Sequence, residues 1–309
     1  MTASSNDWAI GIDLGGTNVR AAAIDHSGAL LDVIAAPIER DFGPPFAQLA
    51  ELVSTLVDGN EQPPTGIGIG ATGPVYPAEG VIDNPFTLPP NYQGNVREAL
   101  HDRFALSIML ENDANAAALG ETWQGAGRGA KSLVCLIVGT GIGVAAVHDG
   151  VLHRGADGAH PEAGHHVVQL SGPACYCGSR GCIESLASGT ALVILARERG
   201  AEVETTADVF DGASNGDPAC RQTVIDAREA IAIAARNLVA VHAADVVMLS
   251  GGALGDPAAV RDDVQKAIDA FAFLPPGGTA VRLAELGQLS GCYGAAFLAL
   301  SAGVPLEDQ

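Results

Sequence analysis

The sequence predicts an α/β protein made of two similar halves with a cleft between them. Three observations support this prediction. Apolar, strand-like segments alternate with segments of helical spacing along most of the chain. A hairpin of the same design occurs in each half. The length, 309 residues, is near the size at which one core gives way to two domains.

The first half begins with a three-stranded meander, because apolar segments are separated by glycine turns at 15–16 and 27–28. Helical spacing after a proline pair predicts a helix at 44–59. The remaining elements expected in this half are strands at 65–72 and 107–113 and helices at 93–104 and 114–123.

The second half opens with the strand 132–141, which runs into a glycine turn, and with a hairpin at 143–155. An alanine-rich segment predicts a long helix at 218–242. Residues 245–252 read as a strand that ends in a glycine turn, and 288–303 as the closing helix.

The two hairpins resemble each other in sequence. Residues 17–25, TNVRAAAID, align with residues 140–148, TGIGVAAVH, and Gly28 and Leu30 then match Gly150 and Leu152. A repeated strand, Gly-Thr turn, strand and Gly turn is typical of a duplicated domain. The alternative is a chance recurrence of Gly-Thr hairpins.

Composition excludes several classes of partner. A formal net charge of −20 would repel nucleic acid and anionic lipid. The first residues lack the basic and apolar regions of a secretory signal, and no apolar run is long enough to span a membrane. We therefore expect a cytoplasmic protein, whose thiols stay reduced.

Two glycine turns are candidate phosphate-binding loops: DLGGT at 13–17 and GTGIG at 139–143. Glycines let backbone N–H groups approach an anion, and threonine adds a hydroxyl donor. Asp13, at the end of an apolar strand, suits a hydrated Mg²⁺ held mainly by phosphate oxygens. The alternative is that both are ordinary hairpin turns.

Two further glycine-rich segments do not fit nucleotide-binding motifs. Residues 68–73 match G-x-G-x-x-G, but prolines follow where a dinucleotide-binding fold needs a helix. Residues 125–132 nearly match a P-loop, yet Ala130 replaces the required glycine and the order of helix and strand is reversed. Neither a Rossmann nor a Walker protein is predicted.

Asp113 lies where a predicted strand ends and a helix begins, in LENDANAAALGE. Its structural role would be an N-cap. Its functional role would be a general base that takes a proton from a substrate hydroxyl. The neighbouring amide of Asn112 could orient that substrate.

Three cysteines fall within eight residues: Cys175, Cys177 and Cys182 of CYCGSRGC. In a reduced compartment, three thiolates need one further ligand to complete a tetrahedral zinc site. A redox pair fits less well, because the C-x-x-C spacing is absent. The cysteines could also form a disulfide or stay as free thiols.

Taken together, DLGGT, ENDANAAALGE, GTGIG, HPEAGH and CYCGSRGCIE resemble the ROK family of bacterial sugar kinases and repressors. The resemblance covers nearly the whole chain. It implies an actin-like (sugar kinase/Hsp70/actin) fold of duplicated α/β domains, with ATP and a hexose in the interdomain cleft. We expect a smaller domain of residues 1–116 completed by 290–309, and a larger one of 117–289 that carries the zinc loop.

The resemblance also implies roles for individual residues. Asp113 would be the catalytic base. The sugar would be lined by Asn84, Asn112, Asp113, Glu162, His165 and Glu184. The phosphates and adenosine of Mg²⁺-bound ATP would lie against Asp13, Gly15, Gly16, Thr17, Thr140, Gly141, Gly251 and Gly252. A closed, structural zinc site would consist of His165, Cys175, Cys177 and Cys182.

Glucose is the expected hexose, phosphorylated at its primary hydroxyl. N-acetylglucosamine, N-acetylmannosamine, mannose and fructose are the alternatives, since His160-Pro161 resembles fructokinase-like relatives and the cysteine spacing resembles the glucokinase branch. A sugar-responsive repressor is disfavoured, because it would need an N-terminal helix-turn-helix and the first strand starts near Trp8. A zinc-ribbon binding module would need a second cysteine pair. By analogy with relatives we expect a homodimer or homotetramer.

Overall fold

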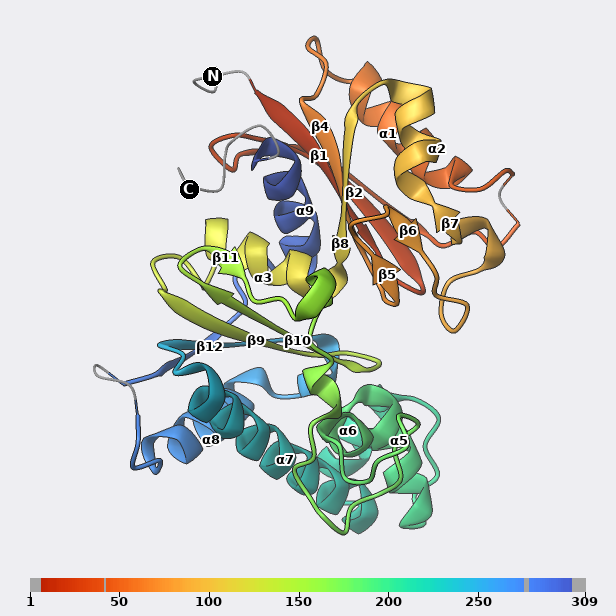
Figure 1. Cartoon of the computed structure of the whole chain (residues 1–309). Coiled ribbons are helices and arrows are strands. Elements are labelled where there is room, and N and C mark those ends of the chain that lie inside the picture. Colours follow the sequence, from red (N-terminus) through yellow and green to blue (C-terminus); the bar gives the residue numbers. More distant parts are fainter. Residues whose placement is uncertain (1–6, 42, 275–277, 302–309) are drawn as a thin grey trace. The chain divides into compact units, whose positions relative to one another are not determined.

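The computed structural model describes residues 7–41, 43–274 and 278–301 of the chain. Contacts divide the chain into two compact units (Figure 1). Unit 1 consists of Met1–Gly129, Gly150–His160 and Glu285–Gln309, and unit 2 of Ala130–Asp149 and Pro161–Ala284. No helix in the described ranges is long and apolar enough to cross a membrane.

Unit 1 contains a five-stranded sheet with the order β3-β2-β1-β4-β8. The first three strands form the predicted antiparallel meander, and β1, β4 and β8 are parallel. These strands are β1 Trp8–Leu14, β2 Asn18–Asp25, β3 Leu30–Pro37, β4 Gly66–Ala71 and β8 Ser107–Asn112. A small sheet that the sequence did not predict consists of β5 Val75–Tyr76, β6 Val81–Ile82 and β7 Gly94–Asn95.

Helices cover both faces of this sheet (Figure 1). They are α1 Ala47–Asp58, α2 Val96–Phe104, α3 Asp113–Gln124 and α9 Ser290–Ser301. Alternate residues of β1 point to opposite faces. Ile10 and Ile12 join the core formed with α1 and α2, whereas Ala9 joins the core formed with α9.

Glycines let α9 lie directly on the sheet. A Cβ at Gly11 would stand 1.8 Å from the carbonyl oxygen of Cys292, and one at Gly68 would stand 1.8 Å from that of Ala295. The same helix meets α3 through Gly294, where a Cβ would collide with the backbone of Ala116. This packing places all of α3 in unit 1, whereas the expected boundary at 116/117 lies within that helix.

A second five-stranded sheet has the order β11-β10-β9-β12-β13. Its strands are β9 Ser132–Val138, β10 Ile142–His148, β11 Val151–Leu152, β12 Val246–Ser250 and β13 Ala280–Leu283. The long helix predicted at 218–242 is α7 Pro218–His242. Further helices, which the sequence did not predict, are α4 Ile183–Ala187, α5 Gly189–Glu198, α6 Thr206–Ser214 and α8 Pro257–Asp269.

The two sheets confirm the predicted duplication, because corresponding strands occupy corresponding positions in the two orders. In the first hairpin Val19 pairs with Leu14, and in the second Ile142 pairs with Val138. This register matches the alignment of 17–25 with 140–148. The first turn, Gly15–Asn18, is one residue longer than the second, Gly139–Gly141.

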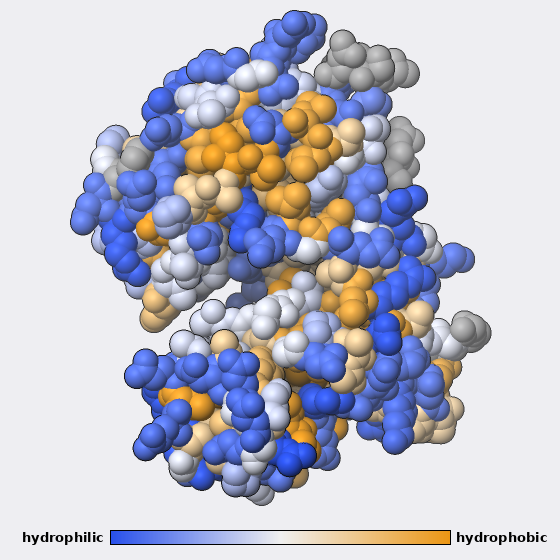
Figure 2. Space-filling view, turned by 180° about the vertical axis from the view of Figure 1, so that it is seen from behind, coloured by the Kyte–Doolittle hydropathy of each residue, from blue (hydrophilic) through white to orange (hydrophobic). Residues whose placement is uncertain are grey.

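Most of the visible surface is hydrophilic. In the view from behind, hydrophilic side chains predominate on both units, and a hydrophobic patch interrupts them on unit 1 (Figure 2). Edge strand β3 carries the exposed aliphatic side chains of Leu30, Leu31 and Val33.

The close packing of α9 gives a testable prediction. Gly68→Ala should lower the free energy of unfolding by about 3 kcal/mol, because the added methyl group would meet backbone that cannot move independently. Gly59→Ala is the matched control, since a Cβ there meets nothing closer than 3.5 Å. Urea unfolding of both variants tests this, and equal midpoints would contradict the role of Gly68.

Candidate active site

The junction between β8 and α3 presents a carboxylate at the helix N-terminus. Asn112 is the N-cap, and its Oδ1 accepts the N–H groups of Ala114 and Asn115 at 2.9 and 3.3 Å. Asp113 is therefore the first helical residue and not the cap, which corrects the structural role considered from the sequence. Its Oδ1 accepts the N–H of Ala114 at 2.7 Å, and the residue is half-buried.

A buried carboxylate, that of Glu111, stabilises this junction through hydrogen bonds. Glu111 is 1% exposed and accepts hydrogen bonds from the N–H of Asn112 and from Asn115 Nδ2, both at 2.9 Å. It also forms an ion pair with Arg154. A buried charge is costly without a partner, and Arg154 provides that partner. Neither Glu111 nor Arg154 was predicted from the sequence, although a glutamate closing an apolar strand was a usable signal.

Asp13 lies at the end of β1, close to Asp113. Burial, followed by the negative charge of Asp113, raises the pKa of Asp13 to about 6, and Arg20 partly opposes this shift. Arg20 Nη1 lies 3.8 Å from Asp13 Oδ2, a long ion pair. Gly291 of α9 packs against the same side chain, where a Cβ would stand 2.8 Å from its Cγ. Two neighbouring carboxylates are an oxygen donor set that suits Mg²⁺.

The raised pKa of Asp13 predicts a pH-dependent stability. The folded chain binds this proton more tightly than the unfolded chain, so the free energy of unfolding falls as pH rises from about 4 to about 6. Without Mg²⁺ or nucleotide, Asp13→Asn should be more stable than wild type at pH 7.5, by about 1–2 kcal/mol after allowing for partial exposure.

That difference should vanish near pH 4, where the wild-type carboxyl is protonated. Asp32→Asn, on exposed strand β3, is the control and should match wild type at both pH values. Urea unfolding measures the effect. A difference that is the same at pH 4 and pH 7.5 would contradict it.

The first glycine turn is closed by its own backbone and packed against a neighbouring loop. The N–H of Gly15 donates to the carbonyl of Asn18 at 3.0 Å. A Cβ at Gly16 would stand 3.3 Å from Cβ of Thr87, so the turn fits closely beneath residues 84–87. Thr17 is exposed at its tip.

Asn84 organises that loop through its side-chain amide. It is fully buried, and its Nδ2 donates to the carbonyl of Thr72 and to Thr87 Oγ1 at 3.1 and 2.6 Å. Its Oδ1 accepts the N–H groups of Phe86 and Thr87. An amide has two donors and two acceptor positions, and all four are used. These bonds give Asn84 a structural role, and its expected contact with the sugar stays a prediction.

In unit 2, Glu184 of α4 reaches the second glycine turn. Its Oε2 accepts the N–H of Ile142 at 2.8 Å and lies close over Gly141. The short helix η3, Ala163–His165, packs on the same residue, because a Cβ at Gly164 would stand 2.2 Å from the carbonyl oxygen of Ile142. The glycine of E-x-G-H is thus a point of close approach, and Glu184 and His165 both lie near the turn.

The cysteines and His165 form one cluster. One ligand atom from each of His165, Cys175, Cys177 and Cys182 lies within 4.8 Å of the others. Cys175 Sγ is 3.4 Å from His165 Nδ1, and the sulfurs of Cys177 and Cys182 are 3.6 Å apart. A disulfide needs about 2.05 Å, whereas tetrahedral zinc separates sulfur ligands by about 3.7 Å. The spacing fits zinc, and all three cysteines are free thiols in this structure.

The remaining predicted residues flank the turns of unit 2. Thr140 and Gly141 are exposed, and the carbonyl of Thr140 accepts the hydroxyl of Thr190 at the start of α5. Gly251 has φ of 107° and passes so close to Val138 that a Cβ would collide with its backbone. A Cβ at Gly252 would meet no atom within 4 Å. Glu162 is exposed beside His165.

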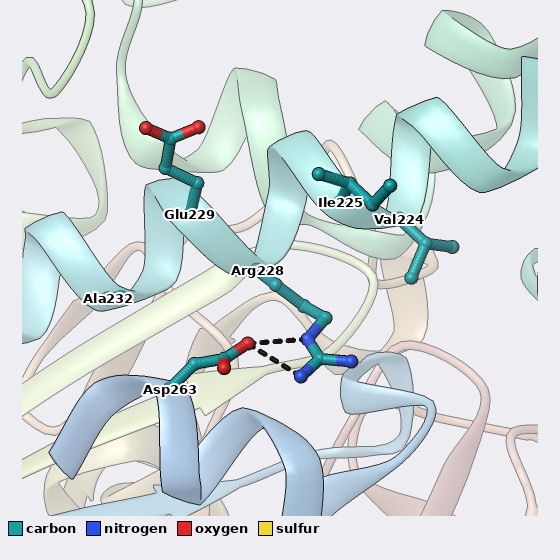
Figure 3. A pocket seen from close by; sticks show the side chains of 6 residues that line it. All are labelled: Val224, Ile225, Arg228, Glu229, Ala232 and Asp263. Atoms are coloured by element: carbon teal, nitrogen blue, oxygen red, sulfur yellow. Dashed lines mark hydrogen bonds and ion pairs between the residues drawn. The ribbon is translucent and has the colours of Figure 1, made fainter. Parts of the chain in front are cut away.

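Two hollows lie on the surface of unit 2. One, of about 420 Å³, borders Leu254, Gly255 and Asp256, which follow the Gly251-Gly252 turn. The second, of about 310 Å³, lies over α7 and α8, where Arg228 is paired with Asp263 (Figure 3). The two hollows share Val224, Ile225 and Arg228, and none of the predicted site residues lines either of them.

Two sheets of the same order, each with a glycine turn in its first hairpin, define a duplicated α/β protein of the actin-like sugar kinase class. The ROK family model matches residues 9–302, and the chain belongs to the ROK family.

The named relatives include sugar kinases and also a xylose repressor from Caldicellulosiruptor bescii. The chain is 34% identical over 262 residues to a glucokinase from Thermotoga maritima, a match that covers 79% of this chain and 81% of that protein. It is 30% identical over 246 residues to an N-acetylmannosamine kinase from Vibrio cholerae, covering 79% and 83%.

Solved structures agree along nearly the full length. A ROK hexokinase from Thermus thermophilus has a TM-score of 0.84 at 32% identity, covering 98% of this chain and 100% of that one. A ROK family glucokinase from Streptomyces griseus, in complex with glucose and AMPPNP, has a TM-score of 0.73 at 27% identity, covering 95% and 99%.

Proposed function

We propose that the protein is an ATP-dependent hexose kinase that phosphorylates glucose at its primary hydroxyl. The observation that carries this proposal is the pair of carboxylates in unit 1, in which Asp113 is held at the start of α3 beside Asp13. One carboxylate suits proton abstraction and the other a metal-bound phosphate. Glucokinases and a hexokinase among the relatives support the same reaction.

Asp113 would accept the proton of the hexose hydroxyl as the γ-phosphoryl group is transferred. The N-terminus of α3 favours its ionised form. Asn112 uses its Oδ1 as the helix cap, so its Nδ2 is the atom we assign to a sugar oxygen. The chemistry depends mainly on positioning, since phosphoryl transfer needs little covalent assistance from the protein.

Asp13 and the glycine turns would hold the nucleotide. Mg²⁺, when bound, neutralises charge on the phosphates. Asp13 would bind it through water or phosphate oxygens, and the backbone of Gly15, Gly16 and Thr17 would contact the phosphates. In unit 2 the corresponding residues are Thr140 and Gly141, and the adenosine would lie near Gly251 and Gly252.

Residues of unit 2 would bind the hexose hydroxyls; these are Glu162, His165 and Glu184. Glu184 bonds to the N–H of Ile142, and Gly164, next to His165, packs on the carbonyl of the same residue. We assign the cysteine cluster to a closed structural zinc site, in which His165 Nδ1 and three thiolates would be the ligands. Such a site would fix the ring of His165 and leave Nε2 directed away from the metal.

N-acetylmannosamine is the second candidate substrate, because a kinase for this sugar is among the relatives. We also propose the cytoplasm as the compartment, where reduced thiols and ATP are available together. A homodimer or homotetramer remains our expectation for the assembly.

Asp113→Asn tests the catalytic assignment. The change keeps the shape of the side chain but removes the base, so kcat for glucose should fall about 10²- to 10⁴-fold. Glucose affinity should change little. Coupled ADP-release kinetics and calorimetric glucose titration measure the two quantities, and Asp102→Asn on α2 is the control. Wild-type turnover by Asp113→Asn would refute the assignment.

Cys177→Ser tests the zinc assignment. Purified wild type should contain about one zinc per chain, and the variant should contain almost none and should unfold at lower temperature. Cys220→Ala is the control, because this buried cysteine lies outside the cluster. Metal analysis with thermal unfolding tests this. A zinc-free wild type, or equal zinc in Cys177→Ser, would be evidence against the site.

A further inference from the structure

Tyr176 lies between the first two cysteines of the cluster, and its ring faces His165. The residue is 83% exposed. The two rings meet edge to face, with centroids 5.0 Å apart and planes at 89°. The Tyr176 hydroxyl is 3.2 Å from His165 Nε2. The exposed ring is therefore held by a polar contact at its tip.

That contact occupies the ring nitrogen of His165 that faces away from the cysteines. Nδ1 lies 3.4 Å from Cys175 Sγ. Each imidazole nitrogen carries either one hydrogen or one lone pair and makes one strong hydrogen bond. The phenol of Tyr176 and a second hydroxyl group cannot both bond to Nε2. One must leave when the second arrives.

Glu184 is a further polar neighbour of the same hydroxyl. The Glu184 carboxylate lies within hydrogen-bonding reach of the Tyr176 hydroxyl. The phenol therefore lies between His165 and Glu184. Both residues belong to the proposed hexose-binding wall. A phenol offers one O–H donor and acceptor lone pairs, as a sugar hydroxyl does.

We propose that the Tyr176 hydroxyl occupies the position of a hexose hydroxyl between His165 Nε2 and Glu184, and that hexose binding displaces it. Tyr176 then sets the affinity of the site for sugar, because each binding event must first break its contact. This inference rests on the proposed hexose kinase function. It concerns binding and not phosphoryl transfer, since Tyr176 leaves before the reaction.

Tyr176→Phe tests the proposal. The variant keeps the ring and its edge contact with His165 but removes the competing hydroxyl. Glucose titrated by calorimetry without ATP should bind about two- to tenfold more tightly than to wild type, the range for one lost hydrogen bond. In kinetic assays KM should fall by a similar factor while kcat stays within about twofold.

Tyr76→Phe is the matched control, because Tyr76 is another exposed tyrosine, on β5 of unit 1. Zinc content and circular dichroism of Tyr176→Phe should equal those of wild type. Unchanged glucose affinity would make Tyr176 a bystander, and weaker affinity would make its hydroxyl a direct sugar contact; either result overturns the proposal. If wild type phosphorylates no hexose among glucose, N-acetylmannosamine and fructose, the proposed function fails as well.

Discussion

The site depends on how the chain turns from β8 into α3. Three consecutive polar residues have separate tasks there: Glu111 anchors the turn from the buried side, Asn112 caps the helix, and Asp113 is left at the first helical position. The buried ion pair of Glu111 with Arg154 makes this arrangement expensive to disturb, because losing one partner would leave a charge in the core. A carboxylate beside Asp13 is the consequence, and it gives unit 1 the negative charge that a metal–phosphate group would neutralise.

In unit 2, the elements that carry Glu184 and His165 both contact Ile142, which immediately follows the second glycine turn. Glu184 bonds to its N–H, and Gly164 packs on its carbonyl, so the helix that carries His165 and the turn form one assembly. The cysteine cluster adjoins this assembly through His165. A structural metal there would stabilise the proposed hexose-binding residues and, through Glu184, the proposed phosphate-binding turn.

Strands and hairpins could be predicted because apolar runs between glycine turns have few alternative conformations, and the repeat at 17–25 and 140–148 was visible in the letters. Contacts between residues distant in sequence could not be predicted. Asn112 and Asp113 are both good caps, and only backbone geometry decides between them. Asn84 matched by position, yet its amide is used inside its own loop. Arg154 pairs with Glu111, 43 residues away in sequence, and no local sequence pattern indicates that pairing.

A crystal structure of the chain with glucose and a non-hydrolysable ATP analogue would examine the assignment of Asp113 most directly. We expect the glucose O6 to lie within about 2.6–3.2 Å of an Asp113 carboxylate oxygen, with Asp13 on the phosphate side. Glucose bound with a different hydroxyl at Asp113, or with no atom near that carboxylate, would contradict the assignment.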